Sequence, residues 1–449
     1  MLWRYCMHAL FQWWRFIFGF FQWMGWRLNG TAGMLDTIWN GAAYEMSAHV
    51  MKISWRFKPD RFWRNSTQDY IATHVGFEHP DVVRKKTISL YAVTPSEAVF
   101  VEVPEDVELY NCKKTPLLYI RQHEAAVRII RMPISSFNKL ADVIGDPDEK
   151  TVVFLHFVAR SGSTLLMQIL TTFHGEKRAI SISEAGSDSQ LISDRGKYSD
   201  DEFKRVFRNT FRLICKDPAS LIAMKMSFPD SLELAPLIKE TFPKFHQFFS
   251  YRNALPLNRS KALLYSQIVN FKSMNFAQRW PLFAQLLRLP REQRLRDYYG
   301  DKMYQRLKGY LPNFTMYQTI CIHTAIQFEA YQSQFKNGVG VRGVKYEDIR
   351  TEPKMALEKI LDHIGLAKHR YQVPEMLKAM EEDAHINGIP ECMSKRHAVD
   401  HDNVLPVESA MPATISQIDD LCSALGLPLL SRQHPLEGTI TDATVSPRL

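Results

Sequence analysis

Residues Thr151–Leu170 read TVVFLHFVARSGSTLLMQIL, in which two apolar runs flank the polar turn Arg160–Thr164. Most residues of the first run are β-branched or aromatic, which is typical of a strand buried on both faces of a parallel sheet. The second run is mostly unbranched and helix-forming. The stretch therefore predicts a strand that turns directly into a helix.

A turn of this kind is suited to binding an anion. The first N–H groups of a helix have no partner within it, and Gly162 lets an anionic group approach the backbone closely. Arg160 supplies a cation. The hydroxyls of Ser161, Ser163 and Thr164 supply further donors. The chain has no G-x-x-x-x-G-K-[ST] and hence no Walker loop. The simpler alternative is that the hydroxyls only cap the helix.

The strand and turn resemble the 5′-phosphosulfate-binding loop of the sulfotransferase superfamily, whose members transfer a sulfuryl group from PAPS (3′-phosphoadenylyl sulfate). The resemblance is carried by the apolar strand and by RSGSTLL, residues 160–166. The cytosolic branch usually has lysine where this chain has Arg160, and an arginine is more similar to the branches that act on proteins, glycans or lipids. The resemblance implies an α/β fold, with a parallel sheet flanked by helices, that uses PAPS and no metal.

A second motif of the family is similar to YRNALPLNRS, residues Tyr251–Ser260. In the family a strand ends in an arginine, and a serine eight positions later joins it on the 3′-phosphate of PAPS; Arg252 and Ser260 have this spacing. The arginine's planar fork and the serine's hydroxyl suit a phosphate near a helix start. The family often has proline soon after the arginine, where this chain has Ala254. The alternative is that Arg252 pairs with an acid of the protein.

A third match is VKYEDI, residues Val344–Ile349, followed by Pro353 and an amphipathic helical pattern that ends at Gly365. This strand and helix resemble the late part of the superfamily. The acids Glu347 and Asp348 are expected to hold the helix and the loop in place. Matches that follow the family's order are stronger together than any one of them.

The resemblance also bears on the general base that takes the acceptor's proton. Many cytosolic members use a histidine in a K-T-H motif, but the matching residues here are Lys225-Met226-Ser227, so the histidine is absent. In the carboxylate-base branches the base follows the second strand, a place that Glu184 in SISEAGSD matches. The alternative is a surface acid at a strand end. Arg160 is expected to neutralise charge on the leaving phosphate.

Strand and helix patterns alternate after the opening stretch. Strands are predicted at Arg178–Ser183, Ser220–Phe228 and Lys244–Arg252, with a helix at Asp201–Cys215. This alternation indicates βαβ units and a parallel sheet, whose ligands sit at the carboxyl ends of the strands. The residues predicted to share that edge are Arg160, Glu184, Ser227 and Arg252.

The N-terminal 26 residues are strongly aromatic and contain no acid. At about 100° per residue, their polar or small positions fall in one arc of about 80°. With Arg15 at its centre, this helix is poorly suited to span a membrane, and we expect it to lie in or dock onto one. The alternatives are a degraded signal anchor and a helix of the protein's own core. The residues of the arc are Arg4, His8, Gln12, Arg15, Gly19 and Gln22.

The segment Met34–Phe57 is compatible with a further, less apolar helix. Short strands are then predicted within 87–132, in a small β-rich element. Asp146-Pro147-Asp148 resembles a metal-binding D-x-D only superficially, because the proline holds the carboxylates on a turn. The predicted strands are Thr87–Val93, Ala98–Val103, Pro116–Ile120 and Ala126–Met132.

The composition is that of a globular protein: 449 residues, 45% hydrophobic and 23% charged, with a net charge of +8. This charge fits anionic ligands without specifying nucleic acid, and no nucleic-acid partner is expected. Six scattered cysteines form no zinc motif. Sequons at Asn29, Asn65, Asn258 and Asn313 are weak indications of a lumenal location. The expected location is membrane-associated, with the Golgi and the cytoplasm both open.

Four segments are predicted. The third of them contains a helical insertion with a basic pattern at Arg279–Tyr310. It also contains Cys392–Arg396, the candidate for the loop that closes over the nucleotide. The tail beyond about Pro435 is expected to be flexible. The segments are a membrane-associated segment (1–70), the β-rich element (71–148), a sulfotransferase-like domain (149–400, with a helical insertion at 270–312) and a partly flexible C-terminal extension (401–449).

The predicted function is PAPS-dependent transfer of a sulfuryl group to a hydroxyl or amine of a glycan, lipid, small molecule or protein. The oligomeric state stays open. A non-catalytic, membrane-associated relative that binds nucleotide or serves as a scaffold is the main alternative. A P-loop kinase is disfavoured by the missing Walker lysine, and metal-independent nucleotide binding would exclude a glycosyltransferase that uses the D-P-D acids.

Overall fold

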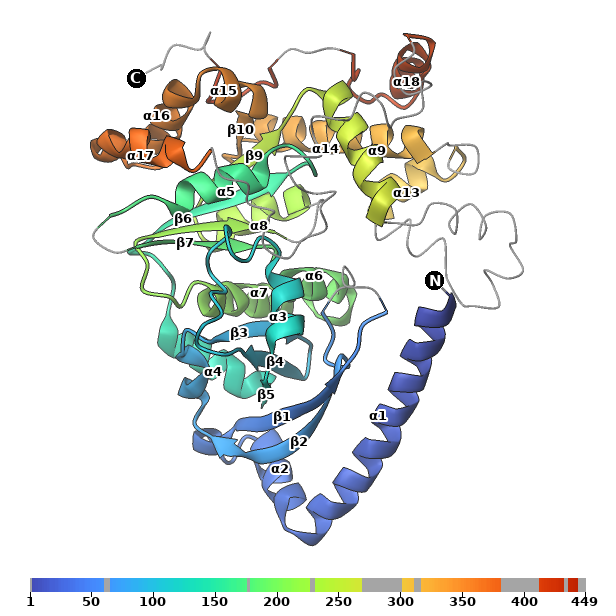
Figure 1. Ribbon diagram of the computed structural model, residues 1–449, viewed down its shortest axis with the longest axis vertical. Coiled ribbons are helices and arrows are strands. Elements are labelled where there is room, and N and C mark those ends of the chain that lie inside the picture. The colour runs from blue at the N-terminus through green and yellow to red at the C-terminus, as the bar shows by residue number, and fades with distance from the viewer. Residues whose placement is uncertain are drawn as a thin grey trace. The chain divides into compact units, whose positions relative to one another are not determined.

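Two five-stranded sheets organise the chain in the computed structural model (Figure 1). The structure describes residues 2–59, 65–175, 178–226, 231–268, 301–310, 316–380, 412–431 and 435–442. The chain divides into two compact units. The first consists of Met1–Lys150, Ile180–Ile222 and Met226–Phe228, and the second of Thr151–Ala179, Ala223–Lys225 and Pro229–Leu449.

The first sheet is antiparallel, with the strand order β2-β1-β5-β4-β3. Its interior face carries an apolar cluster that includes Met51, Tyr91 and Val101. Three of the four short strands expected within 87–132 are present as β3, β4 and β5. The strands are β1 (Ala48–Arg56), β2 (Tyr70–Glu78), β3 (Ile88–Val93), β4 (Glu97–Glu102) and β5 (Arg128–Pro133).

Two expectations for this region are wrong. Residues 48–56 form strand β1 and not a helix, because they pair with β2 on one side and with β5 on the other. Residues of the expected strand Pro116–Ile120 enter helix α3 instead. A short apolar run cannot be told from a buried helical turn by periodicity. Here the run continues into Arg121, Gln122 and Glu124, which favour a helix.

The second sheet is parallel, with the strand order β10-β9-β6-β8-β7, and confirms the predicted parallel sheet flanked by helices. Residues Val152–Leu155 of β6 are fully buried, which explains their uninterrupted apolar sequence. Gly365, predicted to end the late helix, has φ +75° directly after α16. The strands are β6 (Thr151–Phe157), β7 (Ala179–Ser183), β8 (Leu221–Lys225), β9 (His246–Tyr251) and β10 (Arg342–Lys345).

Helices make up most of the remaining described chain (Figure 1). In the first unit they are α1 (Leu2–Leu28), α2 (Thr31–Trp39), α3 (Leu118–Ala125), α4 (Ile134–Ile144), α6 (Gly186–Ser193) and α7 (Asp200–Ile214). In the second they are α5 (Ser163–Thr171), α8 (Ala235–Thr241), α9 (Ala254–Ile268), α13 (Asp301–Leu307), α14 (Met316–Lys336), α15 (Tyr346–Thr351), α16 (Pro353–His363), α17 (Val373–Lys378) and α18 (Pro412–Ala424).

The core of the second unit lies between the parallel sheet and α14. Tyr331 of α14 stacks on Phe249 of β9, with ring centroids 4.9 Å apart. The chain end returns to this core: the Gly343 amide donates to the Gly438 carbonyl, and Thr441 is fully buried. The expectation that the tail is flexible beyond about Pro435 is therefore wrong for residues 435–442.

Within the described residues, α1 and the other helices fall short of the combined length and apolarity that a membrane crossing requires.

Candidate anion-binding site

The predicted strand-to-helix turn is formed between β6 and α5. Gly162 precedes α5 with φ +82°, a left-handed conformation that glycine adopts without strain. A Cβ at this position would lie 2.2 Å from Cδ2 of Tyr346. The first residue of α15 fills the space beside the glycine, so both the positive φ and this packing favour glycine at position 162.

The hydroxyls of the turn are engaged with neighbouring strands. Ser161 is 1% exposed and its hydroxyl donates to Ser250 Oγ on β9, at 3.1 Å. Thr164 Oγ1 accepts from Nζ of Lys225, the last residue of β8, at 3.2 Å. Ser163 is buried at the first position of α5. The turn is therefore tied to β9 through Ser161 and to β8 through Thr164.

Arg160 connects two motifs that lie 100 positions apart in the chain. Its Nε donates to Ser260 Oγ on α9 at 3.0 Å, so residues predicted for the two ends of the nucleotide are in direct contact. Arg160 also has φ +70°, in the left-handed region that non-glycine residues rarely adopt. Such strain persists only where surrounding structure enforces it, and it is frequent at binding and catalytic sites.

Arg252 follows β9 and meets the start of α15. Its guanidinium carbon lies 4.8 Å from the ring centroid of Tyr346, and its Nε lies 3.7 Å from Glu347 Oε1. The same Glu347 oxygen accepts a hydrogen bond from the backbone N–H of Asn253 at 3.1 Å, at the N-terminus of α9. Arg252, predicted to bind the 3′-phosphate, is therefore paired with an acid, as in the alternative interpretation.

Two atoms of this ion pair lack a hydrogen bond. Arg252 Nε and Glu347 Oε2 are both buried and without a hydrogen-bond partner among the described residues. Buried polar atoms of this kind are usually satisfied, so each unmet donor or acceptor disfavours the arrangement as it stands. An added anion would supply the acceptor that Arg252 Nε lacks.

The cations of the site come from strand ends. Arg160 follows β6, Lys225 ends β8 and Arg252 follows β9, and the carboxyl ends of parallel strands lie at one edge of a sheet. Lys225 is 4% exposed, and its Nζ lies 4.9 Å from the ring centroid of Phe157. The edge therefore carries three cationic side chains, of which Arg252 is paired with Glu347.

Glu184 follows β7 in the first unit, as the sequence predicts. Its side chain is half-buried, and its carbonyl accepts from the Tyr119 amide at 3.1 Å. Its φ is +59°, so the described residues contain two non-glycine residues with positive φ, Arg160 and Glu184. These are the two residues that the sequence singled out for catalysis.

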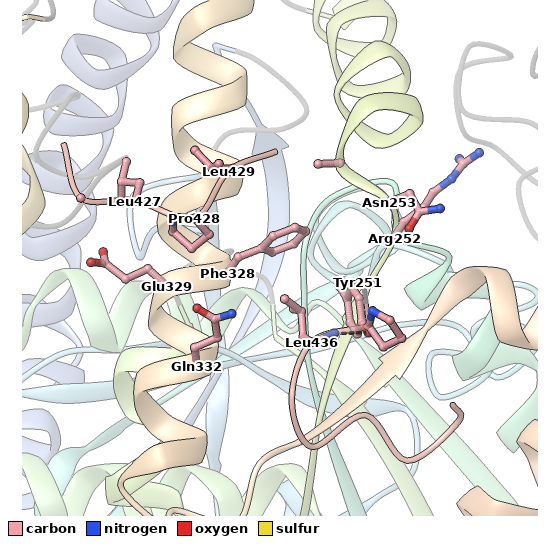
Figure 2. A pocket seen from close by; sticks show the side chains of 13 residues that line it. Tyr251, Arg252, Asn253, Phe328, Glu329, Gln332, Leu427, Pro428, Leu429 and Leu436 are labelled. Carbon is pink, nitrogen blue, oxygen red and sulfur yellow. Dashed lines mark hydrogen bonds between the residues drawn. The ribbon is translucent and has the colours of Figure 1, made fainter. Parts of the chain in front are cut away.

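A cavity of about 440 Å³ opens beside Arg252 (Figure 2). Figure 2 shows Phe328 of α14 and the segment Leu427–Leu429 among its apolar walls. Tyr251 forms another side, where its hydroxyl accepts from the Leu436 amide at 3.0 Å; burial raises the pKa of this phenol. The cavity thus combines an apolar wall with the polar residues at the end of β9.

Other predicted features have structural roles. Asp146 of the D-P-D segment accepts from Arg212 Nε at 2.7 Å and from Arg208, and these bonds lower its pKa. The described part of the chain contains no group of three or more side chains suited to a metal. The sequon residues Asn65 and Asn258 are fully buried and are not accessible acceptors for a glycan.

Several predicted features lie outside the described residues. They are Ser227, Asn313, the candidate closing loop Cys392–Arg396, and all of the insertion 270–312 except 301–310.

Sequence reasoning missed two residues of the site. Lys225 is a cation near the end of a predicted strand of the same sheet, and this position is the signal that could have identified it. Tyr346 stands in the YED motif, but its place beside Gly162 depends on two segments far apart in sequence.

Comparison of the chain with models of protein families and with curated proteins found no match.

Proposed function

We propose that the turn Arg160–Thr164 binds the phosphosulfate end of PAPS and that the protein transfers its sulfuryl group to a hydroxyl or amine acceptor. The observation that carries the proposal is the Arg160–Ser260 hydrogen bond, which unites the two motifs predicted for opposite ends of the nucleotide. The strained backbone of Arg160 supports it further, because strain at a cation beside a helix start is consistent with a ligand-binding role.

In the proposed reaction the acceptor oxygen or nitrogen forms a bond to sulfur while the bond from sulfur to the bridging phosphate oxygen breaks. Adenosine 3′,5′-bisphosphate leaves with the electrons of that bond. Arg160 and Lys225 would neutralise the charge that develops on the leaving phosphate. The resemblance gives Glu184 as the base that takes the acceptor's proton, and its positive φ is consistent with a functional constraint.

The Arg252–Glu347 pair bears on how the 3′-phosphate would bind. A phosphate near the start of α9 would compete with the Glu347 carboxylate for Arg252 and for the Asn253 amide. Because Arg252 Nε has no acceptor, a phosphate oxygen would gain a hydrogen bond there without breaking one. A cavity lined by Arg252 and Asn253 lies beside the place proposed for the 3′-phosphate.

Calorimetric titration with adenosine 3′,5′-bisphosphate tests the proposal. Arg160→Ala is expected to weaken binding by about 100-fold, the effect of losing a charge-assisted contact to phosphate. The exposed Arg84 provides a matched control, and Arg84→Ala is expected to bind like the unaltered chain. Equal affinity of the Arg160→Ala variant and the unaltered chain would contradict the proposal.

Turnover separates the proposed enzyme from a non-catalytic nucleotide-binding protein. The second possibility is favoured by Glu347, which holds Arg252 and the start of α9 as a phosphate would. Incubation with labelled PAPS and a lysate separated into lipid, glycan and protein pools is expected to label one pool. Glu184→Gln is expected to reduce that labelling by orders of magnitude while leaving nucleotide affinity unchanged. Nucleotide binding without labelling would select the non-catalytic protein.

A further inference from the structure

Helix α1 turns Gln12 and Gln22 of its polar arc towards its own protein. Gln22 Nε2 donates to the carbonyl of Ala72 at 3.0 Å, and Gln12 Nε2 donates to the carbonyl of Gln68 at 3.3 Å. Arg15 is half-buried and its Nε donates to Gln12 Oε1. Since Ala72 belongs to β2, the edge strand of the antiparallel sheet, these bonds attach the polar arc of the helix to that edge.

Aromatic contacts of Phe11 and Trp26 fix the same orientation of the helix. Phe11 is 2% exposed and packs against Trp55 of β1 and against Phe57, with ring centroids 5.5 and 5.7 Å away. Trp26 lies 5.5 Å from the ring of His49 and packs on the core of the sheet. The rotation of α1 about its axis is therefore determined by contacts along its length.

The opposite face of α1 is apolar and exposed. Phe16 is 74% exposed, Phe21 65% and Trp13 61%. At about 100° per residue the exposed apolar positions spread over about 180° of the helix circumference and along about 40 Å. Soluble monomers rarely expose a continuous apolar surface of this extent, which marks it as an interaction surface. Its residues are Trp3, Leu10, Trp13, Trp14, Phe16, Phe20, Phe21, Trp23, Met24 and Leu28.

Charge indicates what covers this face. Residues 1–35 contain no acid, whereas Arg4 and Arg27 are exposed near opposite ends of α1. Packing of this face on the same face of a parallel second copy would bring Arg27 beside Arg27, with no acid on the helix to compensate. Anionic lipid headgroups would supply that negative charge. Tryptophan and phenylalanine are also the side chains favoured at the boundary between headgroups and acyl chains.

We propose that the apolar face of α1 inserts into the interfacial layer of an anionic lipid bilayer, with the helix parallel to the membrane and its polar arc on the β2 edge. This association is independent of the proposed sulfuryl transfer. It requires no movement of the helix, because the apolar residues already face outward.

Co-sedimentation of the full chain with vesicles tests the proposal. Binding to phosphatidylcholine vesicles that contain phosphatidylserine is expected, with at least about tenfold weaker binding to phosphatidylcholine alone. The triple variant Trp13→Ser/Phe16→Ser/Phe21→Ser is expected to lose at least about tenfold in partitioning. The double variant Val143→Ser/Tyr371→Ser, at positions 66% and 74% exposed outside α1, is the matched control and should bind normally.

Two further measurements complete the test. Circular dichroism should show unchanged helix content in the triple variant, because its altered side chains are exposed. Sedimentation equilibrium without lipid is expected to show a monomer. The proposal would be overturned if the unaltered chain failed to bind anionic vesicles, if the folded triple variant bound them as tightly, or if α1 instead formed a dimer that the triple variant dissociates.

Discussion

Helices α1 and α5 both have strongly apolar sequences, but they use them in opposite ways. In α5, the side chains of Leu165–Leu170 are all buried, and Thr164 in the first turn accepts a hydrogen bond from Lys225. In α1, Gln12 and Gln22 of the polar arc donate hydrogen bonds to the protein, and many of the large apolar side chains are exposed. Burial within the protein explains the apolar sequence of α5. The apolar surface that α1 exposes is explained only by a partner outside the chain.

Truncation of one apolar side chain on each helix gives the largest expected difference. Leu166→Ala is expected to lower the free energy of unfolding by about 3–5 kcal/mol, because Leu166 is fully buried and the change leaves a cavity. Phe16→Ala should change it by less than about 0.5 kcal/mol, since Phe16 is exposed. Urea denaturation of both variants measures this. A large loss for Phe16→Ala would show that α1 is buried in solution.

Replacing a glycine of each region by alanine is expected to give the next largest difference in the free energy of unfolding. Gly162→Ala is expected to cost about 3 kcal/mol, because the new Cβ would meet Tyr346 and the backbone has positive φ. Gly19→Ala on α1 has open space around its Cβ and should stabilise the helix by up to about 1 kcal/mol. Thermal unfolding of the two variants is the measurement. Equal melting temperatures would mean that the Gly162 turn is not held against Tyr346.

His156, in strand β6 beside the turn, should make the free energy of unfolding depend on pH. Burial lowers the pKa of His156 in β6 from 6.5 to about 4, so the unfolded chain binds more protons between these values. Stability is therefore expected to fall by about 2 kcal/mol from pH 7 to pH 5 through this residue. His156→Gln should reduce the slope of unfolding free energy against pH. An unchanged slope in His156→Gln would exclude this residue as its source.

Removing the negative charge of Glu347 is expected to give the smallest effect, a change in nucleotide affinity. This prediction rests on the proposed nucleotide site. Glu347→Gln keeps an oxygen for the Asn253 amide but removes the negative charge beside Arg252. Affinity for adenosine 3′,5′-bisphosphate is expected to rise by about twofold to fivefold, the range of a partly exposed ion pair. Glu352→Gln, at an exposed position nearby, is the control for calorimetric titration. Weaker binding by Glu347→Gln would indicate that the carboxylate supports the site.

Much of the parallel sheet could be predicted, because short stretches of sequence identify its strands. The buried strand β6 contains the apolar run Val152–Leu155, and the Gly162 turn follows it closely. Prediction was poorer in the antiparallel sheet. Strand β1 was expected as part of a helix, because its pairing with β5 joins segments about 80 residues apart that no local pattern connects. Residues 118–120 were expected as a strand and belong to helix α3.

The sequence by itself determined the strand, turn and helix at Thr151–Leu170, the order of the motifs and the apolar character of α1, since each depends on neighbouring residues. Tertiary structure alone decided that Arg160 meets Ser260, that Lys225 and Tyr346 join the turn, and that Glu347 holds Arg252. It also decided which face of α1 is exposed. These outcomes depend on contacts between segments distant in the chain, and periodicity gives the faces of a helix without specifying which one the protein covers.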